Sequence, residues 1–188
     1  MKRRTFDMLL SVTGLVLGVI LLAAGGLLTW GGGFASNTVR DQLVAQQITF
    51  TPAETFATDC LSPLKEWAGK PVDSGNAAKA YSDVIACHMK TAFVGMGLPE
   101  DSTYASLSTA ARATDPASNE GKTLASAVDL AYKGESLRSI LLTAYAFGTI
   151  GAVAMIASYV AYGAGLLMLI LALLGFNHAR RQSPDAVI

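Results

Sequence analysis

Two long stretches without charge constrain this chain more than any other feature. Met8 to Trp30 covers 23 residues and Ser139 to Phe176 covers 38, and neither stretch contains Asp, Glu, Lys or Arg. About 20 consecutive apolar residues are enough to cross a bilayer as a helix. Only 15% of the 188 residues are charged, and 52% are hydrophobic. We therefore predict an all-α membrane protein, with two transmembrane helices and a small helical extracytoplasmic domain between them.

The basic residues beside the two stretches predict the orientation. Lys-Arg-Arg at residues 2–4 precedes the first stretch, and Arg180 and Arg181 follow the second. Short flanks rich in Lys and Arg stay in the cytoplasm. We expect a multi-pass protein of the plasma membrane with both termini cytoplasmic. The region between, from Val39 to Arg138, has 9 basic and 12 acidic residues, so it predicts no nucleic acid partner.

The second stretch is longer than one crossing requires. A helix of 38 residues is about 57 Å long, and the hydrocarbon core is only about 30 Å thick. A hairpin would place Arg180 and Arg181 outside and would leave roughly 19 residues for each leg, with no turn. We predict one crossing at 153–176, preceded by an apolar stem helix at 137–152 that the outer domain covers.

The predicted stem carries a buried stripe and a candidate interaction surface. The stripe repeats at steps of three and four residues and contains Leu137, Leu141, Ala144, Tyr145 and Gly148. A bend is expected at Gly148 and Gly151, because glycine weakens a helix locally. Leu141 and Tyr145 are the residues on which we expect a partner or ligand to bind. The predicted boundaries are a cytoplasmic segment at 1–7, a span at 8–30, an outer domain at 31–136, the stem at 137–152, a span at 153–176 and a cytoplasmic segment at 177–188.

Small residues recur four positions apart in both predicted spans. Gly14 and Gly18 share a face of the first span, and Ala157, Ala161 and Gly165 share a face of the second. Such spacing lets helix backbones approach closely in lipid. The favoured interpretation is packing between the two spans of one chain; a docking face for another membrane protein is the alternative. We interpret the first span as a retained anchor, because its apolar run is longer than that of a signal peptide.

Four short helices are predicted in the outer region. They are expected at 62–69, from 74 or 76 to 95 or 97, after 101, and from about 119. One face of the second helix is expected to be buried, and it contains Ala77, Ala80, Tyr81, Val84, Ile85, His88, Met89 and Ala92. Trp30 to Gly33 is interpreted as a flexible exit from the first span, and Gln46 to Pro52 as a short extended segment. Cys60 and Cys87 are the two cysteines, and their location outside the cytoplasm predicts a disulfide.

Several segments carry a resemblance to a known family. They are "VRDQLVAQQITFTP", "WAGKPVDSGNAAKAYSDVIACHMK", "TYASLSTAARA" and "YKGESLRSILLTAYAFGTIG", in this order between the two spans. Together they resemble a family of small two-span actinobacterial membrane proteins of uncharacterised function, whose members are often labelled aromatic ring-opening dioxygenases. The resemblance extends from Lys2 to Arg181. It implies no catalytic residues, and the two cysteines are not part of the family pattern.

The dioxygenase label conflicts with the chemistry of the chain. Extradiol-type enzymes hold iron with two histidines and a carboxylate. The chain has two histidines, His88 and His178, which the predicted topology places on opposite sides of the membrane. We interpret His88 as a packed core residue and His178 as a residue of the inner headgroup level. We therefore expect no metal, no cofactor and no enzymatic activity.

Two function classes are compatible with these patterns. The spans contain no ionisable residue, which argues against a transporter or pump. The first class is a non-catalytic accessory or assembly subunit of a plasma-membrane or envelope complex, such as a respiratory one, with membrane lipids and a membrane protein as partners. The alternative is an extracytoplasmic module that binds or senses a lipid or another small apolar ligand, in a cleft between the stem and the helices above it.

Overall fold

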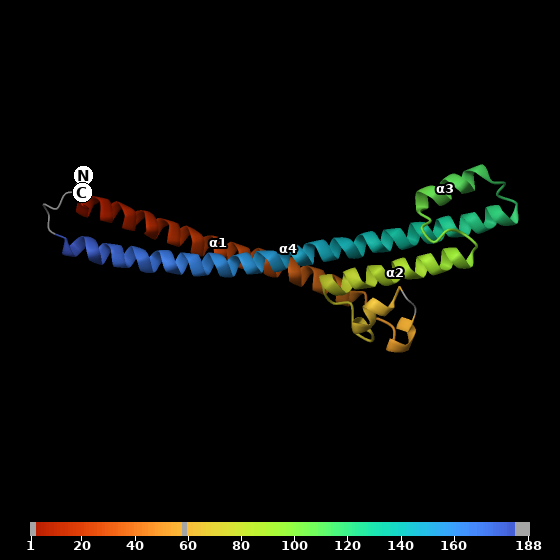
Figure 1. The fold of residues 1–188 in the computed structure, drawn as a ribbon, viewed down its shortest axis with the longest axis horizontal. Coiled ribbons are helices and arrows are strands. Elements are labelled where there is room, and N and C mark those ends of the chain that lie inside the picture. The colour runs from red at the N-terminus through yellow and green to blue at the C-terminus, as the bar shows by residue number, and fades with distance from the viewer. Residues whose placement is uncertain (1–2, 58–59, 183–188) are drawn as a thin grey trace. The chain divides into compact units, whose positions relative to one another are not determined.

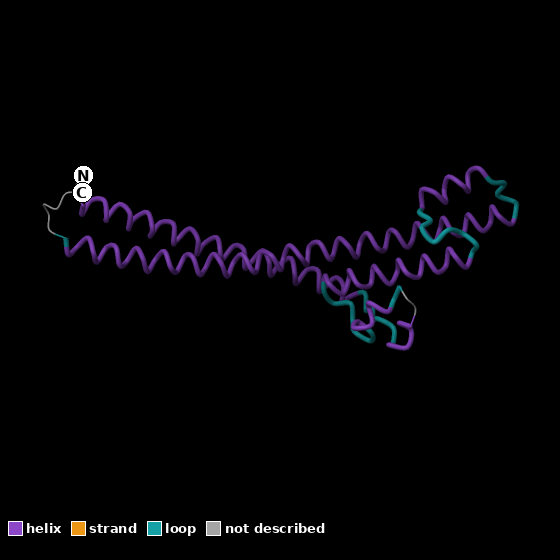
Figure 2. The backbone as a smooth tube through the Cα atoms, viewed as in Figure 1, coloured by secondary structure: helices purple, strands orange, loops and turns teal. Residues whose placement is uncertain are grey.

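The computed structural model describes residues 3–57 and 60–182, and within these ranges the chain is helical and forms no strand. Figures 1 and 2 show the elements in order: α1 (Arg3–Ala45), the 3-10 helices η1 (Ala53–Ala57) and η2 (Ser62–Trp67), α2 (Gly75–Gly95), α3 (Tyr104–Ala113) and α4 (Asn119–Arg181). α1 and α4 are each long and apolar enough to cross a membrane. The predicted all-α class and the two candidate spans are thus confirmed.

The chain divides into two compact units, and α1 and α4 contribute to both. One unit, here called the helix pair, consists of Met1–Ala35 and Ile150–Ile188. The other, here called the central unit, consists of Ser36–Thr149. Part of the predicted cytoplasmic segments, residues 1–2 and 183–188, lies outside the described ranges.

In the helix pair, small residues repeat every seven positions on both helices. The buried members of the repeat are Ser11, Gly18, Gly25 and Gly32 on α1, and Gly151, Ser158, Gly165, Ala172 and Ala179 on α4. A strict seven-residue period is typical of two helices that keep one seam in contact along their length. Because the residues are small, the backbones of α1 and α4 can approach closely.

The contacts along this seam give the antiparallel register. A Cβ placed on Gly14 would lie 3.7 Å from the Cβ of Ala172, and one placed on Gly32 would lie 2.8 Å from the carbonyl oxygen of Gly151. Thr29 and Tyr162 join the two helices through their hydroxyl oxygens, which lie 3.1 Å apart. The apolar part of α1 therefore lies beside the part of α4 that follows Gly151.

The central unit has a first core around the start of α2. α2 begins after Ser74, whose side chain accepts a hydrogen bond from the Ala77 N–H. The core contains Val39, Leu43, Phe50, Phe56, Leu61, Val72, Ala77, Ala78, Ala80, Val84, Cys87 and Leu141. An isolated bridge joins Thr49, which lies inside the segment predicted to be extended, to Pro71. The core brings together the end of α1, the two 3-10 helices, α2 and α4.

A second core joins α2, α3 and α4. It contains Met89, Phe93, Leu107, Leu124, Ala127 and Ala131. α3 begins with a capping box formed by Thr103 and Ser106, which satisfies N–H groups at the start of the helix. Figure 1 shows α2 and α3 both lying beside α4. The four predicted helices of this region are thus present, but the one predicted at 62–69 is a 3-10 helix and the one from 119 is the first part of α4.

The two long helices are continuous where a flexible exit and a separate stem helix were predicted. α4 stays helical through Gly148 and Gly151, so the stem is not a separate helix. Gly148 instead allows a close approach, because a Cβ there would lie 3.1 Å from the Cα of Gly75. α1 likewise continues through Gly31–Gly33, which was interpreted as a flexible exit, and ends at Ala45. In both helices these glycines continue the helix and form no turn. Each faces a neighbouring backbone or open space.

The predicted burial of His88 is also wrong, because this side chain is exposed. α2 is buried along two stripes rather than one. Ala80, Val84 and Cys87 belong to the first core, whereas Met89 and Phe93 belong to the second core and face α3 and α4. His88 belongs to neither stripe, so it lies in solvent although its spacing matches apolar neighbours.

Candidate functional site

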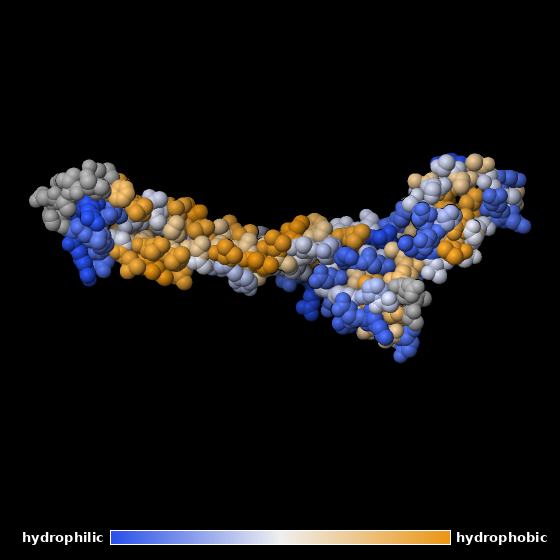
Figure 3. Space-filling model, viewed as in Figure 1, coloured by the Kyte–Doolittle hydropathy of each residue, from blue (hydrophilic) through white to orange (hydrophobic). Residues whose placement is uncertain are grey.

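The part of α4 at residues 137–149, which we call the stem, exposes several large apolar side chains. The exposed fractions are 54% for Leu137, 68% for Ile140 and 55% for Phe147. Leu142 is also exposed. These residues lie in the central unit, where polar side chains otherwise dominate the surface drawn in Figure 3. An exposed apolar patch on a domain outside the membrane is typical of a site for protein or membrane contact.

The opposite face of the stem is used for packing within the chain. Leu141 is buried in the first core, and Ala144 packs against that core. Gly75 lies against this face, since a Cβ placed on it would be 3.3 Å from the Cα of Tyr145 and from that of Gly148. The stem therefore has an inner face that belongs to the core and an outer face that does not.

This division corrects the predicted interaction surface. Leu141, which was predicted to bind a partner or ligand, is only 6% exposed and cannot offer a surface. Tyr145 is half-buried on the same side. Leu137, which was predicted to be part of the buried stripe, is exposed. The candidate surface consists instead of the exposed side chains of Leu137, Ile140 and Phe147.

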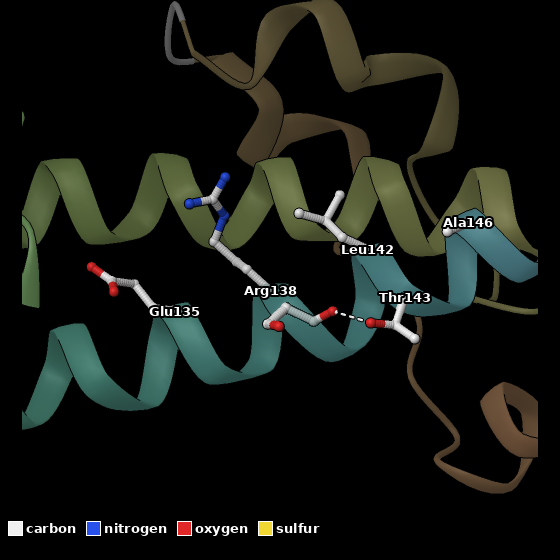
Figure 4. A pocket seen from close by; sticks show the side chains of 6 residues that line it. Glu135, Arg138, Leu142, Thr143 and Ala146 are labelled. Atoms are coloured by element: carbon white, nitrogen blue, oxygen red, sulfur yellow. Dashed lines mark hydrogen bonds between the residues drawn. The ribbon is translucent and has the colours of Figure 1, made fainter.

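A shallow hollow of about 460 Å³ lies on the stem (Figure 4). Its lining residues all come from α4, and they are Glu135, Arg138, Ser139, Leu142, Thr143 and Ala146. The hollow exists because Ser139, Thr143 and Ala146 are short and follow one another along one side of the helix. The Thr143 hydroxyl donates to the backbone oxygen of Ser139 at 2.9 Å, which satisfies it within the helix. The hollow is thus a groove between longer side chains of one helix. It is not the predicted cleft between the stem and the helices above it.

The two charged residues of the hollow hold the neighbouring helices. Glu135 accepts a hydrogen bond from the backbone N–H of Tyr104, at the first residue of α3, with 2.9 Å between Oε1 and N. Arg138 donates from Nε to the backbone oxygen of Ser82 in α2, at 3.2 Å. Figure 4 shows the Arg138 side chain directed toward α2. Both interactions assign these residues a structural role at the edge of the apolar surface.

The residues predicted to pack the spans lie at different depths. Gly18 and Gly165 face each other, since a Cβ on either would lie 3.1 Å from the other's carbonyl oxygen. Gly14 lies on the same seam, whereas Ala157 and Ala161 are half-buried beside it. The seam also contains Gly25, Gly32, Ser158 and Ala172, which were not among the predicted residues. The seven-residue spacing of small residues was the signal that could have found them.

The cysteines and histidines occupy separate places. Cys60 and Cys87 are paired as a disulfide, with 5.7 Å between their Cα atoms, which agrees with the predicted pairing. His88 lies in the central unit and His178 in the helix pair, where its Nε2 is 3.9 Å from an Asp7 carboxylate oxygen. Within residues 3–57 and 60–182, no three side chains of His, Cys, Asp and Glu lie together so as to hold a metal ion.

The chain has no significant match to a protein-family model, to a curated protein or to a solved structure. The resemblance to the two-span actinobacterial family therefore stays a hypothesis. What the chain can do has to be argued from its exposed apolar stem and its helix pair.

Proposed function

We propose that this protein is a non-catalytic integral membrane protein that acts by association, as an accessory or assembly subunit of a plasma-membrane or envelope complex. In this proposal α1 and α4 each cross the membrane once, both termini are cytoplasmic, and the central unit lies outside. The observation that carries the proposal is the exposed outer face of the stem, with Ile140 and Phe147 at its centre.

The register of the helix pair supports the position of the crossing. The first apolar stretch starts at Met8, and the side chain of Ser11 lies against Gly175. At the other end of the seam, Gly32 lies against Gly151. Two antiparallel helices that cross one bilayer must have their apolar parts side by side. The crossing of α4 therefore belongs after Gly151, and the stem projects beyond the hydrocarbon core.

Outside the membrane, the apolar side chains on both faces of the stem have to be buried away from water. The core of the central unit covers the inner face through Leu141 and Ala144. The outer face has large apolar side chains next to the groove of Ser139, Thr143 and Ala146. Short side chains flanked by larger ones let a second helix approach closely. A helix of another membrane protein, extending above the bilayer, is the partner that fits this face.

The alternative function, binding of a lipid or small apolar ligand, has weaker support. Ligand pockets bury about 70–90% of the bound molecule. The hollow on the stem is open, and one helix supplies all of its lining residues. A small molecule bound there would stay largely in water. We therefore favour a protein partner.

Site-directed photo-crosslinking tests the proposal. A photoreactive amino acid at Ile140 or Phe147 should give a discrete crosslinked product with a second membrane polypeptide in native membranes. The matched control is Val94, which is 58% exposed in the same unit but lies on α2. Crosslinks from Ile140 and Phe147 to lipid alone would favour the alternative function. Equal crosslinking from Val94 and from the stem would contradict a specific partner surface.

Mutation of the same face gives a second test. Ile140→Ser with Phe147→Ser should release the partner, because both side chains lose apolar contact area, while insertion and folding are retained. Leu141→Ser is expected to destabilise the central unit instead, because Leu141 is buried. Release of the partner by Leu141→Ser alone, with the chain still folded, would contradict the assignment of the two faces.

A further inference from the structure

Four arginines meet at one end of the helix pair. Arg3 and Arg4 lie in the first turn of α1, and Arg180 and Arg181 lie in the last turn of α4. The two helix ends are adjacent, as the 3.9 Å distance between His178 Nε2 and an Asp7 oxygen indicates. The α1–α4 register therefore brings two short basic segments, which are far apart in the sequence, to one place.

These arginines are not satisfied within the described part of the chain. All four are exposed, and the ion pairs of residues 3–57 and 60–182 include none of them. The nearby acid, Asp7, faces His178 instead. Like charges gathered at one site repel each other, so an anion that binds among them would be stabilised.

The first turn of α1 adds a further attraction for an anion. A helix N-terminus carries partial positive charge and free N–H groups, which acidic side chains often neutralise. The first turn of α1 has no acidic residue, and Arg3 and Arg4 occupy it. Arginines at this end add to the positive potential, whereas Arg180 and Arg181 at the C-terminus of α4 are favourable for their own helix.

We propose that the four arginines form a binding site for anionic phospholipid headgroups at the cytoplasmic surface. This inference rests on the proposed membrane insertion. The site adjoins the apolar parts of α1 and α4, so it lies where lipid phosphates are concentrated. Arginine binds phosphate through two parallel N–H donors, a fork geometry that matches the oxygens of a lipid phosphate. A zwitterionic headgroup carries its own cation and would be less favoured.

Lipid retention by the purified full chain tests the inference. The chain is placed in nanodiscs with equal amounts of phosphatidylglycerol and phosphatidylcholine, and the lipids that stay bound are identified by native mass spectrometry. We expect the native chain to retain phosphatidylglycerol several-fold over phosphatidylcholine. One basic residue near an anionic membrane surface raises the affinity for that surface about fivefold. Replacing all four arginines by Gln should therefore remove the preference for phosphatidylglycerol.

A charge-matched control separates the site from overall charge. Lys65, Lys90, Lys122 and Lys133 lie in the central unit, and their replacement by Gln removes the same number of charges. This variant should keep the preference. Loss of the preference in both variants, or in neither, would overturn the inference.

Two further measurements close the remaining possibilities. Added inorganic phosphate should leave the lipid preference in place; if it abolishes the preference, the cluster binds free phosphate and the lipid assignment fails. Thiol labelling of the reconstituted chain reports insertion independently. A chain that inserts correctly but retains both lipids equally would overturn this inference and leave the proposed function standing.

Discussion

At the residue scale, three successive glycines on α1 have different surroundings. A Cβ on Gly32 would lie 2.8 Å from the carbonyl oxygen of Gly151, whereas a Cβ on Gly31 or Gly33 would have nothing within 4 Å. A backbone oxygen cannot move aside as the end of a flexible side chain can. Gly32 is therefore required by the close approach of α1 and α4, and its two neighbours are not.

We expect Gly32→Ala to destabilise the helix pair by about 1–3 kcal/mol, because the added methyl group forces the two backbones apart. Gly31→Ala and Gly33→Ala serve as matched controls and should be neutral or slightly stabilising, since alanine favours a helix over glycine by about 1 kcal/mol. Thermal unfolding of the three variants in the same detergent checks this. Equal unfolding temperatures would contradict the tight seam.

The pair of cysteines gives a second prediction at this scale. Cys60 and Cys87 are separated by 27 positions, and a disulfide closing such a loop stabilises a domain by about 3–4 kcal/mol in the chain-entropy model. Protein purified from its own membrane should therefore have a mass two hydrogens below that of the reduced chain, and reduction should lower its unfolding temperature. Two free thiols in the unreduced protein would rule out the bond.

At the element scale, α3 is held on α4 by a small number of interactions. Its Leu107 is buried in the second core, and the Glu135 carboxylate accepts the Tyr104 N–H at its start. The rings of Tyr104 and Tyr132 also lie 5.9 Å apart. α3 is buried only at Leu107 and Ser108 and belongs to one core, so it is expected to open more readily than α2, which contributes to both cores.

We expect Glu135→Ala to weaken the attachment of α3, because the Tyr104 N–H loses its acceptor. The loss of a hydrogen bond of this kind costs about 1 kcal/mol, which corresponds to about fivefold faster hydrogen exchange of the α3 amides. Glu135→Gln keeps an acceptor oxygen and should have a smaller effect, and Glu66→Ala, which removes an exposed carboxylate in η2, serves as a control. Unchanged exchange in α3 after Glu135→Ala would show that the core alone holds it.

The elements also show where sequence patterns were sufficient. The ends of α2 follow from local chemistry, and they were predicted to within two residues, with Ser74 or Asn76 as the cap and Gly95 or Gly97 as the end. The full lengths of α1 and α4 were not, because Gly148, Gly151 and Gly31–Gly33 look like breaks until the neighbouring backbone is known. The exposure of His88 depends on which elements cover α2, and periodicity in one helix cannot reveal that.

The candidate site was predicted only as a region. The stem followed from the excess length of the apolar stretch, and its predicted buried stripe is confirmed at Leu141 and Ala144. Leu137 of that stripe is exposed, however, and the partner surface was predicted on Leu141, which is buried. Leu141 and Ile140 are equally apolar neighbours in the sequence, yet one is buried and the other is 68% exposed. Leu141 is buried because it joins a core formed with residues of α1 and α2, whereas Ile140 lies outside that core. A tertiary contact of this kind leaves no local signal at residue 140 or 141.

At the scale of the whole molecule, the proposed topology depends on one argument from charge and one from register. Basic residues at both ends predict cytoplasmic termini. The contact between Asp7 and His178 indicates that the first and last turns of the helix pair lie at the same end. In the proposed topology, an antiparallel pair with both ends together gives an even number of crossings, and the central unit is expected on the opposite side of the membrane from the termini.

Cysteine labelling in intact cells tests this topology. One variant carries Ala125→Cys, at an exposed position of α4 in the central unit. The other carries Ser183→Cys, at a position outside the described residues and next to the end of α4. We expect a membrane-impermeant maleimide to label the variant at position 125 and not the one at position 183.

The controls make the outcome decisive. The parent chain has its two cysteines paired and should give no labelling, and cells opened with detergent should give equal labelling of both variants. Labelling at 183 alone would invert the orientation while keeping two crossings. Equal labelling of both positions in intact cells would place the termini and the central unit on one side of the membrane. It would remove the basis for a stem that rises from the bilayer toward a partner.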